Sequence, residues 1–152
     1  MRAHTAVAAA AVVLTLLTVP ASAAEPQQSA GQIKVVSGAA FIVRGNTVLP
    51  ATIGQRVFEA DKVRTGSDGR LGITLKDDTR FSLGPNSEVH LNRFAYAPSE
   101  GRIGLALNVV RGIAAYVSGR IAKLSPDAVK LETPGAIVGV RGTTLALSVS
   151  PQ

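Results

Sequence analysis

Short apolar runs separated by turn-forming residues dominate the chain, and no stretch repeats apolar residues at helical spacing. Turn signals recur about every eight to twelve residues, a spacing typical of an all-β protein. The pattern predicts strands at 33–36, 39–43, 62–65, 71–76, 79–83 and 87–92. In the last strand Val89 and Leu91 face one way and His90 the other, because strand side chains alternate. Residues 62–92 are therefore expected to form a β-meander with one apolar face.

Glycine and aspartate mark the connections between these strands. The residues expected to shape turns or bulges are Gly69, Asp77, Asp78, Gly84, Gly139 and Gly142. The Asp-Gly pair at 68–69 is expected to supply the positive φ of a tight hairpin. Asp77 and Asp78 are expected to form a two-residue hairpin turn. Asn86 completes a Gly-Pro-Asn turn and is, with His90 and Arg141, a candidate interaction residue.

Polar stretches divide the chain further. Residues 24–32 predict a flexible leader, and 33–150 are expected to form one all-β domain. The stretches 93–102 and 120–128 contain proline and charge, which predicts surface loops.

Two segments resemble each other within the chain. VVSGAAFIVRG (35–45) and VVRGIAAYVSG (109–119) agree at six of eleven positions, and each predicts a strand, a glycine turn and a second strand. Duplication and chance similarity of Val/Gly/Ala-rich sequence both explain the match. If the segments are true repeats, hairpins would stack in a solenoid-like or sandwich arrangement.

The stretch TPGAIVGVRGTTLAL (133–147) predicts a closing strand with a break in register. Even-numbered positions such as Val138 carry the apolar side chains before Arg141, whereas odd-numbered positions such as Leu145 carry them afterwards. Because side chains alternate strictly, this change requires an extra residue or a turn, and Gly142 is the expected pivot. Gly142→Val is expected to lower the melting temperature.

Arg141 would be aimed by that break toward solvent or toward a carboxylate. Its expected partners are Asp68, Asp77 and Asp78. The glycines of this stretch match neither a phosphate-binding loop nor a dinucleotide-binding loop. A four-letter G-x-x-G match at 139–142 lacks the flanking helices of an RNA-binding KH fold. No nucleic-acid partner is expected.

The first residues have the pattern of a secretory signal peptide over 1–23. Arg2 precedes an apolar stretch at 6–19, and Ala-Ser-Ala at 21–23 supplies the small residues of a cleavage site. The apolar stretch is shorter than the roughly 20 residues that a membrane span needs. We therefore expect an exported protein that does not span the membrane after cleavage.

Composition and charge limit the kinds of site and partner that are expected. Hydrophobic residues make up 46% of the chain, enough for a core, and the absence of cysteine excludes disulfides and thiolate metal sites. The net charge is +6, and losing Arg2 with the signal leaves 15 basic and 10 acidic residues, or +5. In an exported protein this charge favours anionic envelope components, although basic residues spread along the chain are also typical of a soluble surface.

Catalytic groups are scarce. After cleavage His90 is the only histidine, and it has no second ligand at metal spacing. Asp77 and Asp78 lack the ligand spacing of a calcium loop, and no serine lies in a nucleophile elbow. We expect no enzymatic activity, no metal and no cofactor.

Three segments, taken together, resemble the FecR domain of bacterial periplasmic proteins. They are DKVRTGSDGRLGITLKDDTRFSLGPNSEVHL (61–91), VVRG (109–112) and TPGAIVGVRGTTLAL (133–147). The resemblance implies an all-β, non-enzymatic periplasmic domain, which in the best-known members relays a signal from an outer-membrane receptor to a cytoplasmic sigma factor. Asp78 stands where the family usually has glycine, so the turn type is expected to differ.

The chain also departs from the signalling members. Where they have a cytoplasmic segment and a membrane helix, it has an expected cleavable signal, so we expect no transmembrane relay by this chain alone. The resemblance then implies a stand-alone periplasmic module that recognises an envelope protein in signalling or assembly, through a sheet edge or a loop face. The alternative is binding of an anionic envelope component, such as peptidoglycan, lipopolysaccharide or lipid.

Overall fold

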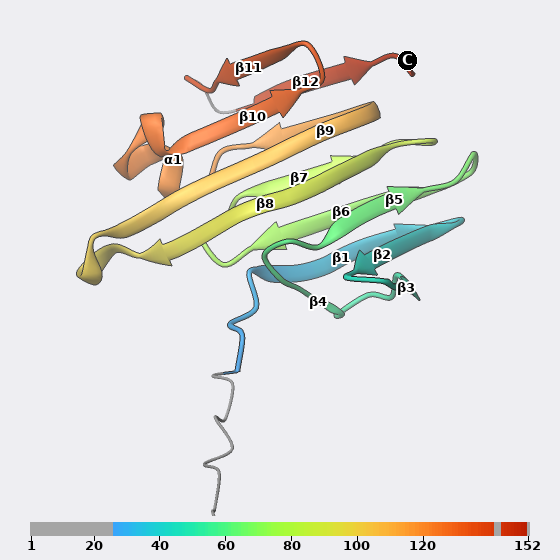
Figure 1. Ribbon diagram of the computed structural model, residues 1–152, viewed down its shortest axis with the longest axis horizontal. Helices are drawn as coiled ribbons and strands as arrows, with labels where there is room; N and C mark the ends of the chain where they lie inside the picture. The colour runs from blue at the N-terminus through green and yellow to red at the C-terminus, as the bar shows by residue number, and fades with distance from the viewer. Residues whose placement is uncertain (1–25, 142–143, 152) are drawn as a thin grey trace, which may run out of the picture.

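The computed structural model describes residues 26–141 and 144–151, so the expected signal peptide at 1–23 lies outside the described residues (Figure 1). Strands make up most of the described chain and its helices are short, and the all-β prediction is confirmed. Strand β6 (Arg70–Leu75) illustrates why, since its buried residues Leu71, Ile73 and Leu75 alternate with more exposed ones. Because strand side chains alternate between two faces, this pattern places one row of apolar side chains against the core, as in a strand and not in a helix.

The strands form two layers that share one long strand, β9 (Arg102–Val117). Layer A contains residues 112–117 of β9 with β1 (Gly31–Ser37), β4 (Arg56–Val57), β6, β7 (Arg80–Leu83) and β12 (Thr144–Val149). Layer B contains residues 102–111 of β9 with β2 (Ala40–Arg44), β3 (Thr47–Pro50), β5 (Lys62–Thr65), β8 (Glu88–Ala97), β10 (Val129–Thr133) and β11 (Ala136–Gly139). Only the β9–β10 pair is parallel among these pairs.

Strand β9, drawn in gold in Figure 1, passes from one layer to the other at Gly112. Gly112 has a φ of 85°, and a Cβ there would lie 2.2 Å from the Ser87 Oγ. The Ser87 hydroxyl accepts a hydrogen bond from the Ile113 N–H at 2.9 Å. Glycine is therefore required both by the backbone angle and by the close approach of the β7–β8 connection.

One hydrophobic core lies between the layers. It draws buried side chains from both of them, including Ile33, Ile73 and Phe81 of layer A and Ile42, Leu91, Leu105 and Leu107 of layer B. Helix α1 (Arg120–Leu124) adds Ile121, which is fully buried. Of the two arrangements expected, the layers correspond to a sandwich, curled into a continuous sheet through β9.

Two of the expected loops have regular structure. Strand β8 continues to Ala97 and is followed by the short helix η1 (Pro98–Glu100) before β9 begins, so the loop prediction at 93–102 is wrong. A register shift between Leu91 and Arg93 lets the strand continue despite the change in polarity. The loop expected at 120–128 contains α1 and the short helix η2 (Pro126–Ala128).

The two similar segments have different structures. Residues 35–45 form the β1–β2 hairpin, with Gly38 at φ 64° in its turn. Residues 109–117 belong to β9, which runs through Gly112 without reversing direction. The prediction of a second hairpin at 109–119 is therefore wrong, because a positive φ bends the strand there instead of turning it back.

Strand boundaries differ elsewhere as well. Strand β1 begins at Gly31, inside the stretch expected as a leader, and Ala30 is already buried at 1% exposure. Strands β3 and β4 were not predicted, because neither carries a clear apolar alternation.

The stretch 133–147 is not a single closing strand. Thr133 ends β10, residues 136–139 form β11 beside it, and β12 crosses to layer A to pair with β9. The predicted change of apolar parity is present, since Val138 and Val140 on one side and Leu145 on the other pack toward the core. The predicted pivot Gly142 lies outside the described residues.

Candidate functional site

Asp77 is a buried structural residue. Its carboxylate accepts hydrogen bonds from the Thr79 N–H at 3.1 Å, the Thr79 hydroxyl at 2.7 Å and the Ile121 N–H at 3.2 Å. The Arg120 N–H donates to the Asp77 carbonyl at 2.7 Å. Asp77 thus joins the β6–β7 connection to the first turn of α1.

Asp78 is exposed in the same connection. It has a φ of 67°, and its carboxylate lies 3.0 Å from the Arg120 guanidinium, with both side chains more than 60% exposed. A hydrogen bond that Arg120 donates to Tyr96 and the charge of Asp78 both raise the pKa of Arg120. The Leu75 N–H donates to the Thr79 carbonyl, so the connection spans four residues and the two-residue turn prediction is wrong.

Gly69 is needed for space and not for a left-handed backbone. Its φ is not positive, and a Cβ there would lie 2.1 Å from the Ala39 carbonyl oxygen. The predicted positive φ is therefore wrong at this position. Asn86 does have a positive φ of 50°, and Gly84 donates its N–H to the Ile113 carbonyl at 2.9 Å.

His90 lies on the outer face of layer B, as its alternation with Val89 and Leu91 predicts. Its Nε2 is 2.7 Å from the Glu88 Oε1, and the other carboxylate oxygen of Glu88 is 3.7 Å from the Arg111 guanidinium. The pair is half-buried. Within 26–141 and 144–151, no cluster of histidine, aspartate and glutamate is suited to hold a metal ion.

Arg141 does not meet the carboxylates expected for it. Asp77 is buried against Thr79, Asp78 pairs with Arg120, and the Asp68 carboxylate accepts the Ala39 N–H at 3.2 Å. Arg141 is exposed and lines a shallow hollow with Lys123 of α1. Gly139 has open space around it and an ordinary φ, so neither space nor backbone angle requires glycine there.

Sequence reasoning missed an ion pair between a buried carboxylate and a partly exposed guanidinium. Asp61 is 1% exposed, and Arg44 donates to both of its carboxylate oxygens at 2.8 and 2.7 Å while lying over the Phe58 ring. The hydrogen bond to Asp61 raises the pKa of Arg44. Because Asp61 also accepts the Phe58 N–H, the pair anchors the connection between β4 and β5. An isolated aspartate and arginine give no sequence signal of this contact.

The outer strands of the two layers are unequal. On one side, β3 has four residues and ends at Pro50, and β4 has only two residues, so both are poor templates for another strand. On the other side, β12 has six residues, TLALSV, with neither charge nor proline. Among the described strands β12 pairs only with β9, which leaves its second edge open.

The open edge is apolar on the side facing the core. Leu145, Leu147 and Val149 of β12 are only half-buried although they pack against the core, and Val138 of β11 is half-buried beside them. On β11 the Ile137 side chain is 72% exposed. Figure 1 places β11 and β12 together at one end of the molecule. An uncharged edge with half-covered apolar residues is a template for strand addition.

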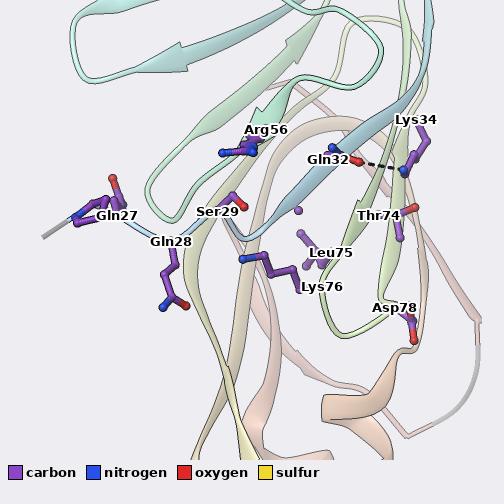
Figure 2. Close-up of a pocket in the computed structure, with 12 residues that line it drawn as sticks. Gln27, Gln28, Ser29, Gln32, Lys34, Arg56, Thr74, Leu75, Lys76 and Asp78 are labelled. Atoms are coloured by element: carbon purple, nitrogen blue, oxygen red, sulfur yellow. Dashed lines mark hydrogen bonds between the residues drawn. The ribbon is translucent and has the colours of Figure 1, made fainter.

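A broad hollow of about 660 Å³ lies beside the segment that precedes β1. Figure 2 shows Arg56, Lys76 and Lys34 approaching it from three segments, with Asp78 at one end and Lys34 bonded to Gln32 at 3.0 Å. Most of its labelled side chains are polar, with Leu75 the apolar exception, and none of its charged residues is buried. It is a basic surface depression without an organised set of catalytic groups.

Comparison with known proteins gives one match. The sequence model of the family described as FecR protein matches residues 61–152. No curated protein and no solved structure matches the chain. None of the helices in the described part of the chain has the length and apolar character needed to cross a membrane.

Proposed function

Because the chain belongs to the FecR protein family, we propose that it is a non-enzymatic regulatory module of the periplasm that recognises an envelope protein in signalling or assembly. Membership of this family suggests a regulatory or signalling role. The expected signal peptide at 1–23 supports a place outside the cytoplasm. The partner contributes an extended segment, which adds to the open edge of β12.

The open edge of β12 is the observation that carries this proposal. A partner strand would satisfy the outward backbone N–H and C=O groups of residues 144–149. Every second side chain of the partner would cover Leu145, Leu147 and Val149, which the domain alone leaves half-buried. The partner segment is therefore expected to alternate apolar and polar residues.

The described titratable groups support a role in binding and not in catalysis. Asp61 and Asp77 are each committed to several structural hydrogen bonds. His90 is turned toward Glu88 on an open face, so neither group is enclosed with a nucleophile in a water-excluding site.

A photo-crosslinking experiment in cells with their native envelope tests the proposal. A crosslinking amino acid replaces Ala146 on the edge of β12, and the matched control replaces Thr47 on the edge of β3, both exposed. We expect one distinct envelope protein to be captured from position 146 and not from position 47. The same products from both positions, or capture of a second copy of this chain alone, would refute recognition of another protein at β12.

A further inference from the structure

A row of side chains crosses the outer face of layer B, away from β12. Arg64 of β5 lies opposite Phe41 of β2 and Glu88 of β8, and Glu88 lies opposite Arg111 of β9. The residues before and after Arg64, Val63 and Thr65, are buried, so Arg64 itself points outward. Four neighbouring strands thus bring two arginines and one aromatic ring into line.

This row borders a hollow of about 330 Å³, lined by Phe41, Val48, Arg64, Thr65, Gly66 and Arg111. Its floor is held in place, because the Thr65 hydroxyl donates to the Gly84 carbonyl at 2.6 Å and accepts the Ser87 N–H at 3.0 Å. Phe41 is 36% exposed and Val48 is 52% exposed, so one wall is apolar and open to a ligand.

The carboxylate of Glu88, which lies between the arginines, does not line this hollow. Glu88 Oε1 is 2.7 Å from the His90 Nε2, on the side of Lys62, whereas the hollow lies on the side of Thr65 and Gly66. Glu88 lies 3.7 Å from Arg111, beyond hydrogen-bond distance. Arg111 therefore keeps its hydrogen-bond donors available beside this ion pair, and both guanidinium groups can donate to another anion.

The guanidinium of Arg64 lacks a partner among the described residues. Its side chain is half-buried, yet in the part of the chain that the structure describes it has no hydrogen-bond or ion-pair partner. A guanidinium carries five N–H donors, and those of Arg64 are not used by the described protein groups. An anion in the hollow would supply the missing acceptor.

We propose that this hollow binds a phosphate group that carries an apolar chain. Arg64 and Arg111 are separated by two strand spacings, about 10 Å at the backbone, so both long side chains reach one anion between them. A guanidinium binds phosphate oxygens through two parallel hydrogen bonds. The apolar chain lies on Phe41 and Val48. The source of the phosphate is either a lipid head group or a soluble phosphate ester.

The full mature chain is titrated with hexyl phosphate to test the site. The NMR signals of the arginine side chains report binding. Arg64→Gln and Arg111→Gln are each expected to weaken binding at least about tenfold, because each removes charge-assisted hydrogen bonds. Arg80→Gln is the matched control, since it removes an exposed arginine of layer A and the same charge. It is expected to leave the affinity unchanged.

The apolar wall has its own test. Phe41→Ala is expected to weaken the binding of hexyl phosphate but not of inorganic phosphate, which does not reach the ring. Co-sedimentation with phosphatidylglycerol vesicles, with phosphatidylcholine vesicles as the control, distinguishes a lipid head group from a soluble phosphate ester. Binding to the vesicles identifies a lipid head group, and binding to hexyl phosphate alone identifies a soluble ester.

Three results would overturn the proposal. The first is an equal loss of affinity for hexyl phosphate in the two arginine variants and in Arg80→Gln. The second is tighter binding of hexanoate than of hexyl phosphate. The third is binding of inorganic phosphate as tight as that of hexyl phosphate. Melting temperatures establish that the variants fold. The wild-type spectrum provides a test without substitution, because the Arg64 and Arg111 side-chain signals must shift on titration before those of Arg80.

Discussion

Environment gives the neighbouring residues Asp77 and Asp78 opposite roles. The Asp77 carboxylate is fully buried and accepts three hydrogen bonds, two from Thr79 and one from Ile121. The Asp78 carboxylate is 63% exposed and pairs with an equally exposed arginine. Exposed ion pairs contribute little to stability, whereas a buried acceptor leaves its donors unsatisfied when it is removed.

We expect Asp77→Ala to lower the free energy of unfolding by about 3 kcal/mol, because it strands the N–H groups of Thr79 and Ile121. Asp78→Asn is the matched control and is expected to change stability by less than about 1 kcal/mol. Urea unfolding measures both values. Similar losses in the two variants would contradict a special role for the buried carboxylate.

At the scale of the element, β9 decides how the layers are joined. Its residues up to Arg111 pair with β8, and those from Gly112 onward pair with β12. A strand with ordinary angles throughout would extend one layer and leave the other without its central partner. The positive φ at Gly112 lets one strand serve both layers.

Gly112→Ala is expected to destabilise the domain by about 2–4 kcal/mol, since a left-handed backbone and a collision with Ser87 both oppose a side chain. Gly135→Ala is the control, because Gly135 has no atom within 4 Å of its Cβ position and no positive φ. It should stay within about 0.5 kcal/mol of the original protein. Thermal unfolding of both variants checks the difference, and equal melting temperatures would count against the bend.

At the scale of the molecule, one core couples the layers. Tyr116 of β9 lies in register with Phe81 of β7 on one side and Leu145 of β12 on the other, and it is 3% exposed. Burial raises the pKa of Tyr116 above its usual range. Ionising this hydroxyl is therefore linked to unfolding of the whole domain.

The sign of this linkage follows from the raised pKa. Above about pH 10 the unfolded chain loses the tyrosine proton while the folded protein keeps it, so folding stability declines as pH rises further. Urea unfolding at increasing pH should show this decline in one transition, and Tyr116→Phe should reduce it. A variant with the same alkaline slope as the original protein would show that other groups account for the decline.

Local patterns predicted part of the fold. The strand at 62–65 was predicted with its observed bounds, and those at 71–76 and 79–83 to within one residue, because alternation and turn residues are local signals. The outward placement of His90 followed from the same alternation. The extension of β8 to Ala97 was missed, because a register shift carries the strand through a polar stretch.

The candidate sites were less accessible to sequence reasoning. Arg64 and Arg111 are far apart in the chain and meet only because β5 and β9 both flank β8. The uncharged stretch TLALSV was visible, but its role as an open edge depends on what it does not pair with. The resemblance to the FecR domain indicated the family without indicating either surface.

The sequence by itself determined the all-β class, the inward and outward faces of many strands and the family, since these depend on residues close together or on a linear motif. Only the tertiary structure decided which strands are neighbours, where β9 bends, that Asp77 is buried while Asp78 is not, and which edge stays open. Strand pairing joins residues distant in the chain, and several pairings suit the same alternation. The choice among them is made by the packing of one shared core.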